Sequence, residues 1–266
     1  MNHCRFKRAS NLACSHASIA VVFAVLITTA RTMAAPAADA GALLKAAFDN
    51  WRANSSQTTM TMTVHRPEWE RHMSMLACTR SEDKALVRFI APPKDAGNAT
   101  LKLGAQMWVY NPKLNQVIKL PASMIAQPWM GSDFSYNDLA KADDVLTEYT
   151  HHIVASTHAD GHTVFDIEAI PKPGAPVVWG KQVLKVRDDG VLLQQEFYDQ
   201  DMKLVRTMNT DKVAILGGRD YPVVITMHPA ENENNWTRIE TTQGKFNISL
   251  PDYLFTQSNL ENPRDR

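Results

Sequence analysis

Histidines are the side chains in this sequence that could most readily hold a metal ion. His151 and His152 are adjacent within an alternating segment, so their side chains face opposite sides of a strand and do not share a metal. His158 and His162 flank an Asp-Gly turn and approach each other across a hairpin, with Asp160 nearby. A protein metal site usually needs about four ligands with carboxylate or thiolate partners, and no such set gathers here. The sequence therefore predicts surface histidines and no metal site.

Nucleophilic or acid–base chemistry has few candidates. Ser132 lies in the tripeptide Gly131-Ser132-Asp133, which lacks the flanking glycine and the strand-to-helix context of a nucleophile elbow. Cys78 ends an alternating segment, which favours a buried, inert thiol. The acidic pair Asp143-Asp144 indicates a polar helix face, Asp188-Asp189 indicates a turn, and no glycine-rich loop precedes a helix to hold a phosphate. We therefore expect no catalytic residues and no cofactor.

The unusual chemistry of the chain is apolar. It contains 12 methionines, and the stretch PWMGSDFSYNDL (128–139) interrupts the alternating segments with aromatic residues around a turn. Methionine is flexible and polarisable and suits surfaces that accept varied apolar partners. Core filling is the better explanation for any single methionine, so the prediction of a ligand surface depends on their combination with the aromatic stretch. The residues that we expect at a hydrophobic ligand site are Trp108, Tyr110, Trp129, Met130, Phe134, Tyr136, Met60 and Met62. Because a register error of one residue exchanges the two faces of a strand, the face of each strand residue stays open.

The elements that position these residues are mostly strands. Apolar residues at helical spacing predict one helix over 40–54. Period-two alternation then predicts strands over 59–64, 72–78, 84–90, 100–110, 115–120, 146–156, 162–170, 180–187, 192–199, 204–210, 221–228 and 236–243. Asp160-Gly161 and Asp189-Gly190 favour tight hairpins. A meander of roughly a dozen antiparallel strands must curl or have its faces covered.

The aromatic stretch lies between the two groups of strands. Ser135 is expected to cap a short helix, with Asp138 favouring its first turn, and Ser132 and Asp133 are expected in a turn. We interpret residues 122–144 as a lid segment that covers an apolar cavity, within one β domain over 38–266.

The N-terminus has the order of a secretory signal peptide. Basic residues precede an apolar run over 19–27 that is too short to span a bilayer, and small residues follow. We expect residues 1–34 to be removed, with cleavage near 34–37. That segment holds four basic and no acidic residues, so the mature chain keeps 24 Lys and Arg against 28 Asp and Glu, a net charge of −4. The charge argues against nucleic acid as a partner. No later apolar run is long enough for a membrane span, so only peripheral or transient membrane contact is expected.

Several segments together resemble the outer-membrane lipoprotein-sorting protein family, the LolA-like proteins associated with RND/MMPL-type exporters. They are SEDKALVRFIAPPKDAGNATLKL, MWVYNP, GSDFSYNDL, LLQQEFYDQDMKLVR, GGRDYPVVITM and NWTRIE, in this order over about residues 55–260. The resemblance implies a mainly β fold, a curled antiparallel sheet forming an incomplete β-barrel capped by helical lid segments. It also implies a periplasmic, non-enzymatic carrier of a Gram-negative bacterium that holds acyl chains of a lipid or an acylated lipoprotein.

Two other functions stay open at this point. One is a periplasmic sensor or adaptor of an exporter or envelope-stress system, for which lipid is a signal rather than cargo. The other is an enzyme acting on envelope lipids, and the missing catalytic constellation argues against it.

Overall fold

The computed structural model describes residues 38–264. The expected signal peptide and its cleavage site lie outside these residues. The first element is the helix α1 (Ala40–Arg52), which begins where the Asp39 carboxylate accepts a hydrogen bond from the backbone N–H of Gly41 at 2.9 Å. It buries Leu44, Ala47 and Phe48, which recur at helical spacing, so one face of α1 is attached to the sheet.

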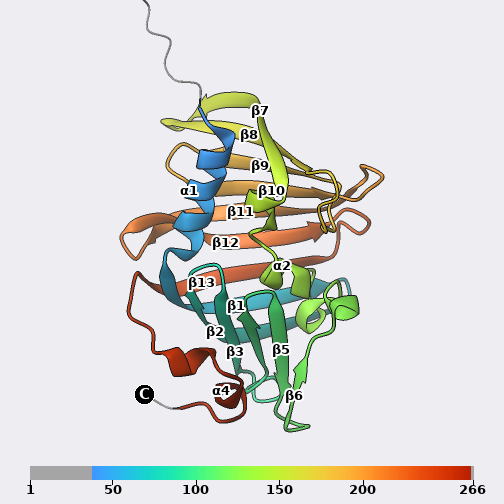
Figure 1. Ribbon diagram of the computed structural model, residues 1–266, viewed down its shortest axis with the longest axis vertical. Coiled ribbons are helices and arrows are strands. Elements are labelled where there is room, and N and C mark those ends of the chain that lie inside the picture. Colours follow the sequence, from blue (N-terminus) through green and yellow to red (C-terminus); the bar gives the residue numbers. More distant parts are fainter. Residues whose placement is uncertain (1–37, 265–266) are drawn as a thin grey trace, which may run out of the picture. The chain divides into compact units, whose positions relative to one another are not determined.

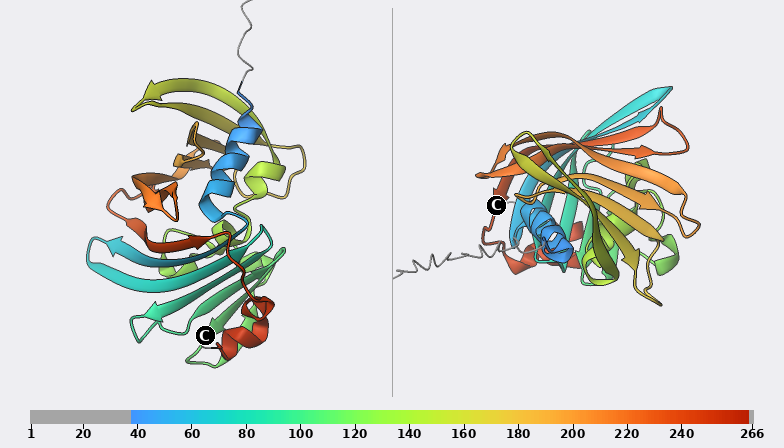
Figure 2. Two further views of the ribbon diagram at one scale, coloured as in Figure 1. Left: turned by 90° about the vertical axis from the view of Figure 1, so that its left-hand side faces the viewer. Right: turned by 90° about the horizontal axis from the view of Figure 1, so that it is seen from above.

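Thirteen strands form a single antiparallel sheet. Their bounds are β1 (Ser55–Arg66), β2 (Trp69–Arg80), β3 (Lys84–Ala91), β4 (Ala99–Leu103), β5 (Gln106–Asn111), β6 (Gln116–Lys119), β7 (Tyr149–Ala159), β8 (His162–Pro171), β9 (Lys181–Arg187), β10 (Leu192–Tyr198), β11 (Leu204–Leu216), β12 (Arg219–Pro229) and β13 (Trp236–Phe246). The sheet curls without closing into a barrel, which confirms the mainly β, incomplete-barrel fold expected from the sequence (Figures 1 and 2).

The order of the strands explains why a non-strand segment is needed. From β1 the chain runs strand by strand to β6 at one edge, and from β7 at the other edge it returns to β13, which pairs with β1. The connection from β6 to β7 must therefore pass from one edge of the sheet to the other. It contains η1 (Ala122–Met124), η2 (Trp129–Gly131), α2 (Tyr136–Ala140) and α3 (Asp144–Thr147). The lid segment expected over 122–144 is the main part of this connection.

The two faces of the curled sheet are covered by different segments. On the concave face, a large apolar cluster includes buried residues of α1, of the lid segment and of strands from both halves of the sheet. On the opposite face of β2–β5, a smaller cluster includes Cys78, Leu86 and Leu101. The C-terminal elements η3 (Asp252–Phe255) and α4 (Gln257–Glu261) supply Phe255 and Leu260 to this second cluster.

One expected strand is in fact a hairpin. Apolar residues recur at every second position over 101–107, but the chain reverses between β4 and β5, where Leu103 pairs with Gln106. Gly104 has φ of 55°, a left-handed conformation that glycine adopts without steric cost. The alternation continues across the turn, so periodicity alone did not reveal it.

None of the helices within residues 38–264 is long and apolar enough to cross a membrane.

Candidate functional site

The aromatic part of the lid segment is a tight loop whose large side chains point toward the sheet. The backbone N–H of Trp129 donates to the carbonyl of Phe134 at 2.7 Å, and the Ser132 hydroxyl donates to the Trp129 carbonyl at 2.7 Å. Met130 and Gly131 have left-handed backbones that let the loop close. Trp129 and Phe134 are thereby buried in the concave cluster.

Trp129 is the deepest anchor of this loop. Its side chain is 3% exposed and its ring lies 5.4 Å from that of Phe89 on β3. Its indole Nε1 donates to Thr100 Oγ1 on β4 at 3.2 Å, which satisfies the polar atom that burial of an indole would otherwise leave unpaired.

Asp133 joins the same loop to the centre of the sheet. Its carboxylate accepts two hydrogen bonds from the Arg66 guanidinium of β1, at 2.9 and 3.1 Å. It also accepts from Thr237 Oγ1 of β13 at 2.6 Å. A bidentate pair of this kind is stronger than a point contact and fixes orientation. Ser132 and Asp133 lie in the turn, as expected, and both are committed to structural hydrogen bonds.

The short helix α2 is capped and then paired with the sheet. The Asp138 carboxylate accepts from the backbone N–H and the hydroxyl of Ser135, at 2.7 and 2.9 Å, so the expected cap at Ser135 is present. The same carboxylate is paired with Arg206 of β11, whose side chain is only 8% exposed. Arg206 also donates to the Asp133 carbonyl at 2.9 Å, so it holds both parts of the lid segment.

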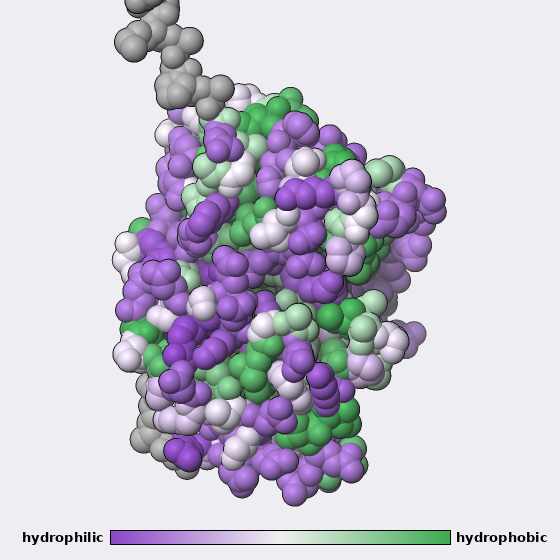
Figure 3. Space-filling model, viewed as in Figure 1, coloured by the Kyte–Doolittle hydropathy of each residue, from purple (hydrophilic) through white to green (hydrophobic). Residues whose placement is uncertain are grey.

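A cavity of about 310 Å³ lies between the concave face of the sheet, the C-terminal end of α1 and the lid segment. Its deep part is apolar. Among the lining residues are Phe48, Met60, Met75, Val87, Met107, Trp129, Phe134, Phe197, Met208, Ile225, Met227 and Ile239. On the surface that carries α1 and the lid segment, apolar residues are scattered in separate patches among polar ones (Figure 3).

Four of the five methionines that line the cavity form two cross-strand pairs, which make up the cavity floor. Met60 lies opposite Met75 in the β1–β2 register, and Met208 lies opposite Met227 in the β11–β12 register. All four line the cavity. Directly opposed side chains on one face of a sheet touch each other. The two methionine pairs are therefore a flexible part of a lining that also contains branched residues such as Ile225 and Ile239, and they can adjust to different apolar guests.

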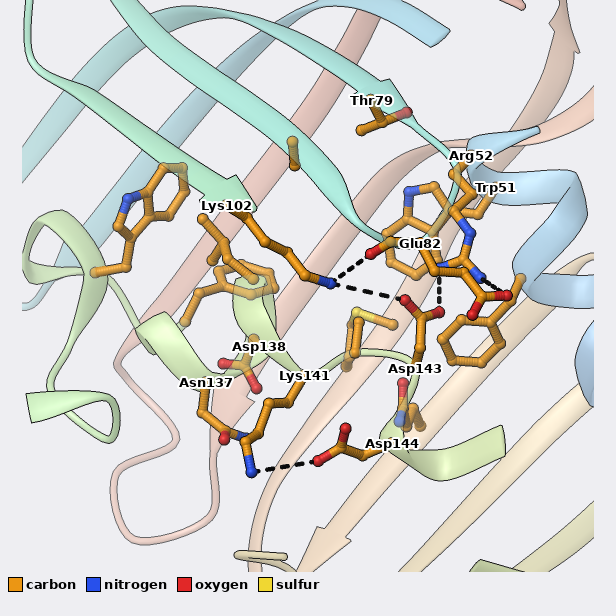
Figure 4. Close-up of a pocket in the computed structure, with 18 of the residues that line it drawn as sticks. Trp51, Arg52, Thr79, Glu82, Lys102, Asn137, Asp138, Lys141, Asp143 and Asp144 are labelled. Carbon is orange, nitrogen blue, oxygen red and sulfur yellow. Dashed lines mark hydrogen bonds and ion pairs between the residues drawn. The ribbon is translucent and has the colours of Figure 1, made fainter. Parts of the chain in front are cut away.

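One end of the cavity is polar, and Figure 4 shows how its charged side chains converge. Asp143 of the lid segment is paired with Arg52 of α1, and its second oxygen lies 4.0 Å from Lys102 Nζ of β4. Lys102 donates to the Glu82 carbonyl at 2.7 Å. Nearby, Lys141 Nζ lies 3.6 Å from the Asp144 carboxylate.

Burial shifts two of these groups toward their neutral forms. It lowers the pKa of Lys102 from its usual range, against the opposing effect of the Asp143 carboxylate. It raises the pKa of the Asp144 carboxyl, against the opposing effect of Lys141. Both directions have one cause, the partial removal of these charged groups from water.

The structure divides the eight residues that we expected at a hydrophobic ligand site. Met60, Trp129 and Phe134 line the cavity. Met62 lies beneath it in the concave cluster, where Met130 and Tyr136 pack at its margin. Trp108 and Tyr110 lie on the other face of the sheet, in the cluster covered by the C-terminal elements.

Sequence reasoning did not identify the polar residues of the cavity, and it interpreted Asp143 only as part of a polar helix face. Arg52, Lys102 and Asp143 are far apart in the chain and meet only because α1, β4 and the lid segment converge. Met208 and Met227 carried a weaker signal, since each lies in an expected strand, but their opposition depends on the β11–β12 register.

The histidine that we had considered for a metal site has a different environment from the one expected. His162 Nδ1 lies 2.9 Å from Asp188, and together with Asp189 these side chains place potential ligand atoms within 4.8 Å of one another. Asp189 is already paired with Arg187, and Asp188 accepts the backbone N–H of Thr163. These partners account for the cluster without an ion.

Comparison with known proteins gives a family and a fold. A family model described as "-like: Uncharacterized protein" matches residues 81–262, more than half of the chain. A search of curated proteins finds no match. A solved DUF1329 family protein from Desulfovibrio piger is 22% identical, with a TM-score of 0.75 over 83% of this chain and 97% of that one.

Two further solved structures carry descriptions that concern lipoproteins. One, from Vibrio parahaemolyticus, is described as an outer-membrane lipoprotein-sorting protein domain; it is 21% identical, with a TM-score of 0.71 over 84% of this chain and 98% of that one. The other, a LolA superfamily protein from Nitrosomonas europaea, is 21% identical, with a TM-score of 0.69 over 84% of this chain and 99% of that one. The fold is therefore LolA-like, as the resemblance in the sequence implied.

Proposed function

We propose that this chain, which belongs to the uncharacterized-protein family whose model matches residues 81–262 and has a LolA-like fold, is a periplasmic carrier of acyl chains. The observation that carries the proposal is the cavity of about 310 Å³ with an apolar interior and a polar end. A partly open apolar cavity with a few polar groups at one end matches the shape of an amphiphile. The cargo is the acyl chain of a lipid or of a lipoprotein, taken toward the outer membrane.

The driving force for loading is the hydrophobic effect. Each methylene that moves from water into the methionine-lined interior contributes about 0.8 kcal/mol. Unbranched methionine side chains can adjust to chains of different length and bend. Release then requires that the cavity open. The lid segment is the longest part of its wall outside the strands and α1, and residues 81–82 and 177–179 contribute the rest.

The lid segment is held by side chains rather than by a sheet ladder. Arg66 and Arg206 hold it through Asp133 and Asp138. These contacts can be exchanged for water without unfolding any strand. We therefore propose that the lid segment swings away from the sheet when a membrane or a partner accepts the acyl chain. The exporter of RND/MMPL type suggested by the resemblance stays a prediction.

The identity of the cargo is tested by native mass spectrometry of protein purified from its own periplasm, followed by lipid extraction. A stoichiometric acylated species is expected. An empty protein that instead co-purifies with a stable protein partner would contradict carriage and favour the sensor or adaptor function.

Filling the cavity is expected to exclude the cargo without unfolding the chain. Ile239 lines the cavity and is only partly buried, so Ile239→Trp places a large side chain in the apolar space. We expect lipid occupancy to fall at least about fivefold, while overpacking lowers the free energy of unfolding by about 1–3 kcal/mol. Occupancy is measured by lipid extraction, and stability by urea unfolding.

The neighbouring residue supplies a matched control. Glu240 is exposed on the opposite face of the same strand, so Glu240→Trp adds the same side chain outside the cavity. Lipid occupancy should be unchanged in this variant. If both variants keep full occupancy, the cargo does not enter the cavity.

A further inference from the structure

The polar end of the cavity buries more positive than negative charge. The side chains of Arg52, Lys102 and Asp143 are 15%, 11% and 15% exposed, so two cations share one buried carboxylate. Glu82 approaches Arg52 at 3.4 Å, but its side chain is 54% exposed, and water therefore screens its charge. The buried trio of Arg52, Lys102 and Asp143 has a net charge of +1.

The other charged residues that line the cavity do not remove the imbalance. Lys84 lies 3.8 Å from the Asp252 carboxylate. Asp138 is neutralised by Arg206, and Lys141 lies beside Asp144, so each is part of its own pair. The excess positive charge therefore stays with Arg52 and Lys102.

Both cations also have donors to spare. Lys102 has three ammonium hydrogens, and within residues 38–264 its Nζ donates one hydrogen bond, to the Glu82 carbonyl. Its approach to Asp143 is long, at 4.0 Å. The buried Arg52 Nη2 makes no hydrogen bond within the described part of the chain, although Glu82 Oε1 lies 3.4 Å from it in an ion pair. Buried donors that lack a hydrogen-bond acceptor favour an additional acceptor.

The competing carboxylate belongs to the segment proposed to move. Asp143 is in the lid segment, whereas Lys102 is on β4 and Arg52 is at the end of α1 (Figure 4). When the lid segment moves away from the sheet, Asp143 moves with it, whereas Arg52 stays on α1 and Lys102 stays on β4. An anionic group that enters with the cargo can then take the place of this carboxylate.

We propose that Arg52 and Lys102 form a headgroup site, and that the cargo is an amphiphile with an anionic phosphate or carboxylate head. This inference rests on the proposed function and deepens it. The head contacts the two cations, and the chain extends along the methionine floor. Binding of the head also keeps the two cations paired while the lid segment is open.

The test compares the affinities of the protein without residues 1–34 for amphiphiles that have the same acyl chain length and different headgroups. The probes are hexadecyl phosphate, palmitate and the neutral 1-monopalmitoylglycerol, with inorganic phosphate as a head without a chain. Affinities are measured by displacement of a fluorescent amphiphile below the micelle concentration. Both anionic amphiphiles should bind at least about tenfold more tightly than the neutral one, the gain expected from one charge-assisted hydrogen bond. Inorganic phosphate should displace nothing.

Two substitutions with opposite expected effects identify the site. Lys102→Met should remove the tenfold preference for an anionic head and leave the affinity for the neutral amphiphile unchanged. Asp143→Asn removes the competing charge and keeps a hydrogen-bonding group beside Arg52, so it should tighten binding of both anionic amphiphiles. Lys185→Met is the matched control, because Lys185 is on β9, is not among the lining residues and is paired with Asp166 at 2.7 Å.

The possible results separate the two proposals. If the neutral amphiphile binds as tightly as the anionic ones, or Asp143→Asn changes neither anionic affinity, the headgroup site is wrong and the carrier function stands. If no long-chain amphiphile binds, the carrier function itself is wrong. If inorganic phosphate competes as well as hexadecyl phosphate, the site binds free phosphate and the amphiphile assignment fails.

Discussion

Trp129→Ala is expected to lower the free energy of unfolding by about 3–5 kcal/mol, the usual cost of truncating a buried tryptophan. The side chain is 3% exposed, packs against Phe89 and donates to Thr100. Its removal leaves a cavity between β3, β4 and the lid segment and deletes a buried hydrogen bond. Urea unfolding followed by circular dichroism measures the loss.

The control for this variant is a tryptophan of the same sheet that faces water. Trp69, at the start of β2, is 48% exposed, so Trp69→Ala should cost under about 1 kcal/mol. An equal loss in the two variants would mean that Trp129 does not anchor the lid segment.

Asp133→Ala is expected to cost about 3 kcal/mol, because it leaves a largely buried arginine without its carboxylate partner. Arg66 and Asp133 have side chains 18% and 11% exposed. The variant also deletes the hydrogen bonds that Thr237 and Arg66 donate to the carboxylate. Native-state hydrogen exchange should show the lid segment losing protection first, since it is joined to the sheet by side chains and not by a strand ladder.

A double-mutant cycle isolates the pair. Arg66→Met combined with Asp133→Ala removes both charges, so the double variant should be more stable than the sum of the single losses predicts, by about 1–3 kcal/mol. The exposed pair Lys203–Glu231 is the reference, and Glu231→Ala should cost about 0–1 kcal/mol. Simple additivity of the Arg66 and Asp133 losses would show that the two side chains do not depend on each other.

Much of the fold could be predicted from the sequence, because its strands and its first helix are recognised by local periodicity. Strands that bury one face alternate apolar and polar residues, and a helix that buries one face repeats apolar residues at helical spacing. Both patterns can be recognised along the sequence without knowledge of the tertiary structure. Turn chemistry worked for the same reason, as with Asp160-Gly161, where both residues have positive φ in the hairpin of β7 and β8. It failed at Gly104, where the apolar alternation continued across the turn between β4 and β5.

The lid segment was recognisable because its pattern is not that of a strand. The capping residues Ser135 and Asp138 and the flanking aromatics predicted a turn, a short helix and an apolar face. Its course across the sheet was not predictable, since it depends on β6 and β7 lying at opposite edges. That arrangement follows from the pairing of β1 with β13, a contact between residues more than 170 positions apart in the chain.

The apolar character of the site was predicted correctly, but only some of its residues were. An apolar, methionine-rich surface beneath aromatic residues was evident from residue types. The face of each strand was not, and on β5 one position separates Met107, which lines the cavity, from Trp108, which packs under the C-terminal elements. Because both faces of β3–β5 are buried, the large apolar side chain of Trp108 did not show which face of β5 lines the cavity.

Arg52, Lys102 and Asp143 mark the limit of what a linear pattern can predict. Each has ordinary neighbours in the sequence, and nothing local distinguishes it from a surface charge. Their shared burial arises because α1, β4 and the lid segment close around one end of the cavity. Sequence periodicity reports burial averaged along an element, whereas a charge site depends on side chains brought together across elements, and that juxtaposition exists only in the folded chain.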